Sequence, residues 1–240
     1  PDAWDSLILA MRDKGYEKAE LIEAGLAVAG KGGGVYDKYR NRLMLPVIDV
    51  RGDVIGFTSR VMDDSTPKYL NTPETAIFKK RSILYGLNYA KKTKRPNFIL
   101  VEGNIDVITL HQAGFDNTVA TMGTALTEEH VRLLGRYTKE LVLCYDNDAA
   151  GEDATQRAIA LLRNSEIGVK VLRLPNKRLP DGSLGKQDAD DYIKNCGPAA
   201  FEELMDGSAN SAEYRLSVVR DQFDLNRDDQ RAQYLLAAAE

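Results

Sequence analysis

Residues 141–151 read Leu-Val-Leu-Cys-Tyr-Asp-Asn-Asp-Ala-Ala-Gly, so five apolar or aromatic residues run directly into two aspartates that are one residue apart. A continuous apolar run of this length is typical of a β-strand that is buried on both faces. The residues after Asp148 have apolar positions at helical spacing. We therefore expect Asp146 and Asp148 at the carboxyl end of a buried strand, where open α/β sheets place their ligands.

Two interpretations of these aspartates remain open from this stretch alone. Carboxylates on the same side of an extended segment, with little to neutralise them, indicate a divalent cation. A turn followed by a helix N-terminus also favours aspartates without any ligand.

Length and composition indicate a soluble protein with a substantial core. The 240 residues allow one large domain or two small ones, and 43% are hydrophobic and 28% charged. No apolar run approaches the roughly 20 residues of a membrane span, and no signal-peptide pattern is present. We expect a cytoplasmic location and no membrane association. Because the chain starts at Pro1 rather than methionine, we also expect it to be part of a longer protein.

The cysteines and histidines do not suggest a structural zinc site. Cys144 lies inside the predicted buried strand, Cys196 lies far along the chain, and His111 and His130 are the histidines. No Cys-x-x-Cys pair is present. We therefore expect no zinc within these residues.

Charge is distributed unevenly along the chain. Residues 31–100 contain 14 Lys and Arg against 6 Asp and Glu, whereas residues 101–240 contain 15 against 24. A basic segment followed by an acidic one suits an enzyme that handles a polyanion with the help of metal ions. A chance distribution of surface charge gives the same counts.

The first part of the chain predicts short helices and a β-hairpin. Residues 4–25 have the pattern of two short helices, and the glycines at 32–34 are expected to form a flexible loop. Residues 39–62 predict a hairpin with its turn at 51–53. The polar segment 66–74 follows, and its Lys, Tyr and Asn suit phosphate contacts and base stacking. A solvated basic surface explains that composition equally well.

From Asn97 onward the pattern alternates between strands and helices. Strands are expected at 98–101, 118–121, 141–145 and 169–174, and this order predicts a mostly parallel sheet with right-handed crossovers. We expect Asn104 to cap the first of the helices. The remaining residues are expected to form a loop at 175–187, a helix that opens at 188–191, and further helices from 198 onward.

Carboxylates follow the strands or open the helices of this alternating region. In a parallel sheet such positions converge on one edge, and so many carboxylates share a small volume only if protons or cations offset their repulsion. Mg²⁺ prefers carboxylates, waters and phosphates, and two ions would clamp both sides of a phosphoryl displacement. The residues concerned are Glu102, Asp106, Asp146, Asp148, Asp188 and Asp190.

Two motifs, Val-Glu-Gly-Asn-Ile-Asp at 101–106 and Tyr-Asp-Asn-Asp-Ala-Ala-Gly at 145–151, resemble the signatures of the TOPRIM fold. Primases, type IA and II topoisomerases and some nucleases share that fold. Residues 42–46, 56–60 and above all 66–75 are similar to the basic subdomain of the bacterial replicative DNA primases. The resemblance extends from about Trp4 to the end of the chain.

The resemblance implies an α/β protein in three parts. Residues 1–96 would form the basic N-terminal α+β subdomain of a primase core. Residues 97–204 would form the metal-binding catalytic TOPRIM subdomain, with a mostly parallel sheet and flanking helices. Residues 205–240 would begin a C-terminal helical subdomain.

By the same resemblance the chain is the RNA polymerase core of a primase, a nucleotidyltransferase that synthesises short RNA primers from NTPs on single-stranded DNA. Glu102 would be the catalytic carboxylate, as a metal ligand or as a base for the primer 3′-hydroxyl, together with Asp146 and Asp148. Two or more Mg²⁺ or Mn²⁺ ions would be held by Asp146, Asp148, Asp188 and Asp190, with Asp106 in support.

The implied partners are the DNA template, NTPs and an RNA–DNA primer duplex. Contacts to nucleotide phosphates or template would come from Arg42, Arg60, Lys68, Asn71 and Lys80. The replicative helicase is expected to bind only through a C-terminal domain that lies outside these residues, as does the zinc-binding domain of the family.

The motifs depart from the family pattern at three positions. Asn104 stands where an aromatic residue is common, Asn147 where glycine is common, and Ala189 where proline is usual. Two other functions are compatible with the sequence, a TOPRIM nuclease or topoisomerase-type fragment and a non-catalytic module that binds single-stranded DNA. Cleavage of DNA without NTP incorporation would indicate the first, and salt-dependent binding that is indifferent to Mg²⁺ would indicate the second.

Overall fold

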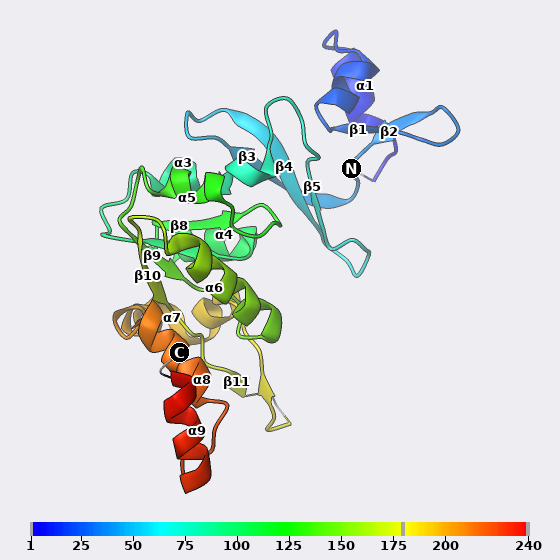
Figure 1. The fold of residues 1–240 in the computed structure, drawn as a ribbon. Helices are drawn as coiled ribbons and strands as arrows, with labels where there is room; N and C mark the ends of the chain where they lie inside the picture. Colours follow the sequence, from blue (N-terminus) through cyan, green and yellow to red (C-terminus); the bar gives the residue numbers. More distant parts are fainter. Residues whose placement is uncertain (1, 179–180, 239–240) are drawn as a thin grey trace.

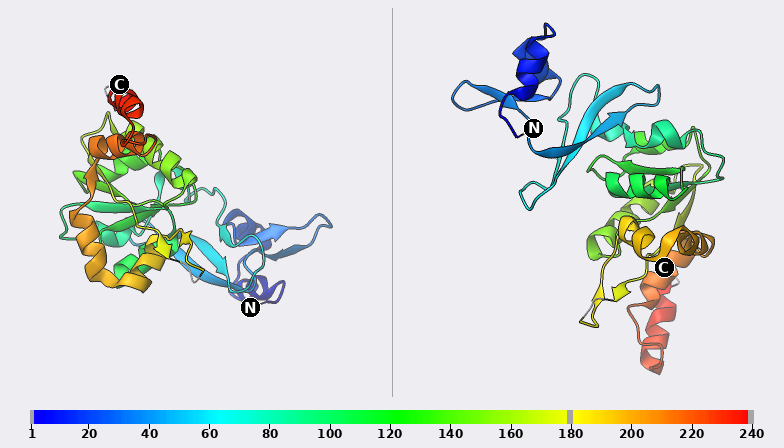
Figure 2. Two further views of the ribbon diagram at one scale, coloured as in Figure 1. Left: turned by 90° about the horizontal axis from the view of Figure 1, so that it is seen from below. Right: turned by 180° about the vertical axis from the view of Figure 1, so that it is seen from behind.

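The computed structural model describes residues 2–178 and 181–238, and it shows a small N-terminal unit, a three-stranded sheet, a six-stranded sheet with flanking helices, and two C-terminal helices (Figures 1 and 2). The N-terminal unit and the C-terminal helices lie at opposite ends of the molecule. In the described residues, no helix has the length and apolar character needed to span a membrane.

The N-terminal unit consists of two helices and a two-stranded antiparallel sheet, so the prediction of two short helices is confirmed. Ile8, Leu21 and Ala27 form its buried core. The buried carboxylate of Asp37 accepts the backbone N–H of Leu7 at 2.6 Å and that of Ile8 at 3.1 Å, which ties the second strand to the start of the first helix. The elements are α1 (Ser6–Arg12), α2 (Lys18–Glu23), β1 (Ala27–Ala29) and β2 (Val35–Asp37).

The predicted hairpin is present and gains a third strand. β3 (Arg42–Ile48) pairs antiparallel with β4 (Val54–Val61), which pairs antiparallel with β5 (Tyr69–Asn71). One oxygen of the Asp49 carboxylate accepts three consecutive backbone N–H groups, from residues 51–53, at 2.8–3.0 Å. This side chain replaces backbone partners in the turn and so fixes its shape.

The six-stranded sheet is mostly parallel, as the alternating pattern predicts. Its strand order is β13-β10-β9-β7-β8-β6, in which the four central strands are parallel and the two edge strands antiparallel. The central strands are β7 (Phe98–Val101), β8 (Thr118–Thr121), β9 (Glu140–Leu143) and β10 (Gly168–Val171). The edges are β6 (Leu84–Tyr85) and β13 (Ala209–Asn210), and η1 (Lys80–Ser82) and α3 (Leu87–Ala90) flank β6 in sequence.

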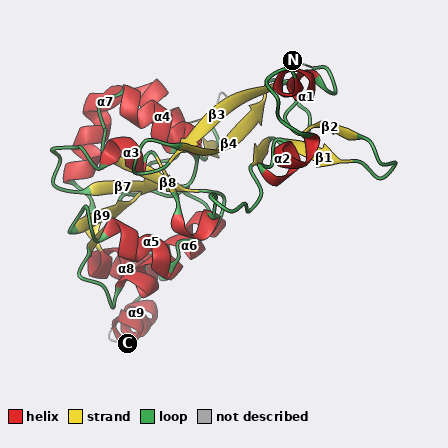
Figure 3. Cartoon of the chain, turned by 90° about the horizontal axis from the view of Figure 1, so that it is seen from above, coloured by secondary structure: helices red, strands yellow, loops and turns green. Residues whose placement is uncertain are grey.

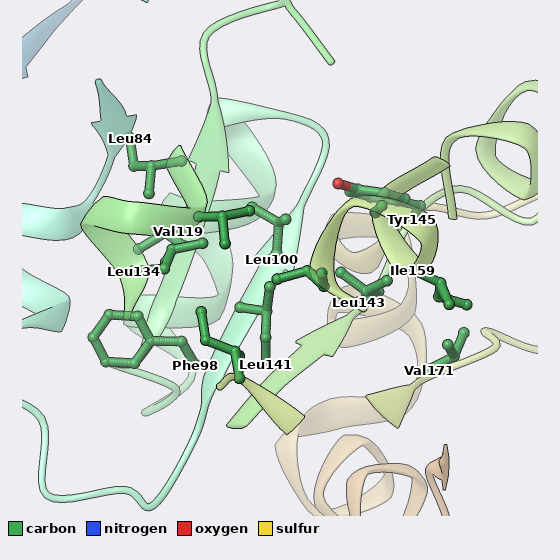
Figure 4. Close-up of a cluster of buried hydrophobic side chains, with 14 of the residues drawn as sticks. Leu84, Phe98, Leu100, Val119, Leu134, Leu141, Leu143, Tyr145, Ile159 and Val171 are labelled. Carbon is green, nitrogen blue, oxygen red and sulfur yellow. The ribbon is translucent and has the colours of Figure 1, made fainter. Parts of the chain in front are cut away.

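Helices cover both faces of this sheet (Figure 3). On one face α4 (Asn104–Gln112) and α7 (Ala189–Asp206) contribute to one buried cluster, and on the other α5 (Glu128–Leu134) and α6 (Ala149–Leu162) contribute to a second. Figure 4 shows the second cluster, in which Leu100, Leu141 and Leu143 are completely buried. Two clusters on one sheet explain why the central strands are apolar on both faces.

Five local expectations are corrected. The strand expected at 169–174 is β10, which covers Gly168–Val171 and so ends three residues earlier. The helix after β7 is capped by Gly103 rather than Asn104, because the Asp106 carboxylate accepts the Gly103 N–H at 3.1 Å. β9 ends at Leu143, although the Cys144 N–H still donates to Leu100 at 2.9 Å.

The expected loop at 175–187 contains the short ladder of β11 (Lys177–Arg178) and β12 (Leu184–Gly185). The region from 198 onward is not entirely helical, because β13 joins the sheet before α8 (Ser211–Arg220) and α9 (Asp228–Ala238). The parts of these expectations that concern residues 179–180 and 239–240 lie outside the described residues.

Candidate functional site

The order of the strands creates a switch point between β7 and β9. The chain leaves β7 toward β8 on one side and leaves β9 toward β10 on the other, so the two loops diverge from adjacent carboxyl ends. Such divergence opens the crevice in which α/β sheets bind ligands. Glu102 directly follows β7, and its Oε1 accepts the backbone N–H of Asp146 at 3.1 Å. The two sequence motifs therefore meet here.

Asp148 begins α6. Its Oδ1 accepts the N–H of Gly151 at 2.9 Å, and its Oδ2 lies 3.1 Å from Lys186 Nζ. The Gly151 N–H and the Lys186 ammonium both lower the pKa of Asp148. Only glycine fits at position 151, because a Cβ there would lie 2.1 Å from the carbonyl oxygen of Asp146. The Asp-Asn-Asp turn and the helix start are thus one compact unit.

Asp106 joins two helices. Its side chain is buried at 7% exposure, and its two oxygens accept the N–H of Gly103 at 3.1 Å and that of Asp190 at 3.0 Å. Burial, and then the negative charge of Asp188, raise the pKa of Asp106 to about 7. The start of α4 is therefore fixed to the start of α7 by one carboxylate.

The start of α7 carries three further carboxylates. Asp188 caps the helix through the N–H of Asp191 at 2.7 Å, and Asp190 binds the Thr109 hydroxyl and Lys194 Nζ. Carboxylate oxygens of Asp188, Asp190 and Asp191 all lie within 4.8 Å of one another. Asp191 was not predicted from the sequence, although a third acid in the first turn of a helix was a visible signal.

These side chains form what we call the acidic edge: Glu102, Asp106, Asp146, Asp148, Asp188, Asp190 and Asp191. Burial raises the pKa of Asp146 to about 6, and the charges of Glu102, Asp188 and Asp148 add to the effect. Asp146 therefore interacts electrostatically both with Glu102 and Asp148 at the switch point and with Asp188 at the start of α7. A donor set of carboxylate oxygens suits a hard divalent cation and lacks the nitrogen and sulfur ligands that zinc prefers.

A second group of predicted residues lies on β4 and β5. Arg60 pairs across the strands with Tyr69, so both side chains lie on the same face, and the guanidinium is 5.8 Å from the centre of the ring. Lys68 Nζ is 5.9 Å from that ring. Asn71 lies on the same face as Tyr69 and donates to the Met122 carbonyl at 3.4 Å. We call Arg60, Lys68, Tyr69 and Asn71 the basic surface.

The basic surface lies against the carboxyl end of the central sheet, because Asn71 donates to the carbonyl of Met122, which directly follows β8. Burial raises the pKa of Tyr69, and the charges of Asp106, Asp188 and Asp190 raise it further, while Arg60 lowers it. Tyr69 is therefore a further candidate residue that the predicted contact residues did not include.

The other two predicted cations are placed differently. Arg42 neighbours Leu43, which pairs with Arg60, so it lies on the opposite face of the sheet and donates to the carbonyls of Pro67 at 2.8 Å and Lys68 at 3.4 Å. Arg42 thus braces the loop that carries Lys68.

The backbone of Lys80 is held at both ends. Its N–H donates to Glu74 at 3.1 Å, and its carbonyl accepts from the buried His130 at 3.0 Å. Lys38 was not predicted. Its ammonium donates to the Asn71 carbonyl, and burial and the nearby charge of Lys80 lower its pKa to about 8.

Comparison with known proteins finds two family matches and several similar proteins. Residues 1–91 match the family described as "DNA primase catalytic core, N-terminal domain", and residues 99–193 match the family described as "Toprim-like". The DNA primase of Clostridium acetobutylicum is 43% identical over 235 residues, which cover 98% of this chain and 38% of that protein. The chain thus spans well under half the length of this curated relative.

Solved structures match along nearly the whole chain. A DnaG primase catalytic domain bound to ssDNA has a TM-score of 0.80 and 36% identity, covering 97% of this chain and 72% of that chain. The RNA polymerase domain of Mycobacterium tuberculosis primase DnaG, in complex with double-stranded DNA, has a TM-score of 0.82 and 32% identity, covering 99% of this chain and 75% of that chain.

Proposed function

We propose, because this chain belongs to the DnaG family of bacterial DNA primases and matches its catalytic core, that it joins ribonucleotides on a DNA template. The observation that carries the proposal is the placement of the acidic edge at the switch point of the sheet, next to the basic surface of β4 and β5. A polyanion held by the basic surface would present its phosphates to carboxylates that hold cations. We propose that the reaction takes place in the cytoplasm, where bacterial chromosomes lie.

The reaction is nucleotidyl transfer. The 3′-hydroxyl oxygen of one ribonucleotide attacks the α-phosphorus of an NTP, a new phosphorus–oxygen bond forms, and the bond to the bridging oxygen breaks so that pyrophosphate leaves. We assign the exposed carboxylate of Glu102 as the base that accepts the proton of the attacking hydroxyl. Positioning and charge neutralisation supply most of the rate in such transfers.

Two or more Mg²⁺ or Mn²⁺ ions would bind at the acidic edge. Asp146, Asp148, Asp188 and Asp190 are the proposed ligands, and Glu102 completes the set. Asp106 supports them, because both of its oxygens already accept backbone N–H groups. When bound, the ions would neutralise the triphosphate and lower the pKa of the attacking hydroxyl.

The basic surface would hold template and nucleotide. We assign Arg60, Lys68 and Asn71 to phosphate contacts, with Tyr69 as a stacking platform for a base. Lys80 would add a further phosphate contact from the segment that His130 holds. Arg42 would act through the loop that it braces.

The division of the chain into parts at residues 96 and 204 is also proposed. Residues 1–96 would guide nucleic acid, residues 97–204 would carry the chemistry, and residues 205–240 would begin a helical subdomain. The replicative helicase would bind to a part of the protein outside these residues.

A primer-extension assay tests the function. An RNA primer annealed to single-stranded DNA, with NTPs and Mg²⁺ or Mn²⁺, removes the need for initiation. Glu102→Gln and Asp146→Asn should abolish extension while thermal unfolding stays normal, since both substitutions keep size and remove charge. Extension by either variant at the wild-type rate would refute the proposal. Cleavage of labelled single-stranded DNA without extension would favour a nuclease instead.

A further inference from the structure

Three aspartates of the acidic edge each have a lysine partner. Lys186 Nζ lies 3.1 Å from Asp148, Lys194 Nζ lies 2.6 Å from Asp190, and Lys177 Nζ is bonded to Asp191. Lys194 comes from α7 itself, one helical turn after Asp190. Lys177 and Lys186 come from the segment between β10 and α7, to which sequence reasoning assigned no role.

Contacts at the base of this segment fix where its lysines lie. The Asn147 side chain, between the two aspartates of the turn, donates to Asn176 Oδ1 at 3.1 Å. The buried side chain of Gln187 donates to the Pro175 carbonyl and closes the base. β11 and β12 then pair Lys177 with Gly185, directly before Lys186. These contacts place the backbone of Lys177 and Lys186 within reach of the acidic edge.

An ammonium group that is bonded to a carboxylate oxygen competes with a metal ion for that oxygen. Asp148 is the clearest case, because one oxygen caps α6 and the other faces Lys186. A divalent cation that binds the second oxygen repels the lysine and drives its ammonium group away from Asp148. The displaced ammonium remains tethered next to the cation, where polyphosphate oxygens are the nearest anions that a nucleotide can offer.

We propose that Lys186 is a displaceable counterion of the acidic edge, which neutralises Asp148 until a divalent cation binds and then contacts the phosphates of the nucleotide. Lys177 is bonded to Asp191, beside the proposed ligands Asp188 and Asp190, and its charge opposes cation binding there in the same way. The inference rests on the proposed function, which supplies both the nucleotide and the divalent cation at the acidic edge. It assigns these lysines opposite effects on the two ligands, since they compete with the cation and attract the phosphates.

Titration with Mn²⁺ tests the first effect, with the free ion measured by electron paramagnetic resonance. Lys186→Gln should bind Mn²⁺ roughly two- to fivefold more tightly than wild type, which is the range expected from the loss of one exposed ion pair. Lys177→Gln should act in the same direction, and Lys186→Arg should restore wild-type affinity. Lys139→Gln is the matched control, because Lys139 pairs with Glu166 away from the acidic edge.

Binding of a labelled NTP at saturating Mn²⁺ tests the second effect. Lys186→Gln should bind the NTP severalfold more weakly, so the two affinities change in opposite directions. If the wild type binds Mn²⁺ and Lys186→Gln binds it with the same affinity, the proposed counterion role is wrong. If Lys186→Gln binds the NTP with the same affinity as the wild type, the proposed phosphate contact is wrong. If wild type itself binds no Mn²⁺, the metal centre of the proposed function fails rather than the lysine inference alone.

Discussion

The acidic edge and the basic surface hold their charges in different ways. At the acidic edge four carboxylates accept backbone N–H groups, those of Glu102, Asp106, Asp148 and Asp188. On the basic surface Arg60 and Lys68 lie beside the ring of Tyr69, at 5.8 and 5.9 Å from its centre. These four acids are therefore placed by the backbone, and the two cations by side chains that can still change rotamer.

This difference matches what the two ligands require. A small cation needs oxygens at fixed positions, and Mg²⁺ in particular demands near-ideal octahedral geometry. A nucleic-acid strand offers a phosphate at every nucleotide, so cations that recognise it need charge more than exact placement. Removing one charge from the acidic edge should therefore reduce activity much more than removing one charge from the basic surface.

After the loss of extension expected for Glu102→Gln and Asp146→Asn, the next largest effect is expected for Asp188→Asn. Asparagine retains the helix cap but loses the charge, so primer extension should fall by on the order of 10³-fold, as for other lost electrostatic contacts to a transition state. Asp181→Asn is the matched control, because Asp181 is exposed in the segment between β10 and α7 and, among the described residues, its carboxylate is hydrogen-bonded to Ser183. A loss for Asp188→Asn of less than tenfold in measured extension rates would contradict the comparison.

The next effect concerns His130, which joins α5 to the segment of η1 that carries Lys80. His130 accepts the Thr127 N–H on Nδ1 and donates from Nε2 to the carbonyls of Lys80 and Ile83. His130→Ala leaves these groups unpaired and should lower the free energy of unfolding by about 2–3 kcal/mol in urea titrations. His111→Ala serves as control and should cost less, because His111 is less buried and bonds one carbonyl. An equal loss of unfolding free energy in the two variants would show that His130 does not hold these elements together.

A smaller effect is expected for the basic surface. Arg60→Ala and Lys68→Ala should each weaken binding to single-stranded DNA severalfold and reduce the slope of log affinity against log salt by about 1. Fluorescence anisotropy at several salt concentrations measures both quantities. Lys139→Ala should change neither. An unchanged slope in both test variants would remove phosphate contact from the basic surface.

The smallest effect is a pH dependence of stability. Burial lowers the pKa of His130 below its ordinary value of 6.5, so the unfolded chain takes up this proton first and the stabilisation is lost as pH falls below 6.5. Asp106 and Asp146 act in the opposite direction, because their raised pKa values favour the folded state at acid pH. The difference between wild type and His130→Ala, followed by thermal unfolding from pH 8 to pH 5, isolates the histidine. A difference that does not change with pH would contradict it.

The central sheet could be predicted closely from the sequence, because its signals are local. The apolar runs at 98–101 and 118–121 are strands with the predicted bounds. Thr127, the residue type that commonly caps helices, caps α5, and its hydroxyl accepts the His130 N–H. The convergence of Glu102 and Asp146 followed from one rule about parallel strands.

The remaining features depend on contacts between distant residues. β13 has two residues and exists because β10 offers it an edge. The face on which Arg42 lies depends on the register of β3 with β4. The lysine partners of Asp148 and Asp191 come from a polar segment whose sequence does not reveal what it folds against. The cap at Gly103 is the exception, because its partner Asp106 is only three residues away, and the prediction of Asn104 did not consider it.

The two hydrogen bonds of Asp106 have a consequence for anyone who would engineer this protein. Since a single side chain spans the beginnings of α4 and α7, the spacing between the proposed metal ligands at these helix starts is inherited from main-chain geometry. Grafting the aspartates onto another scaffold would fail unless both helix starts and their bridging residue were transplanted together.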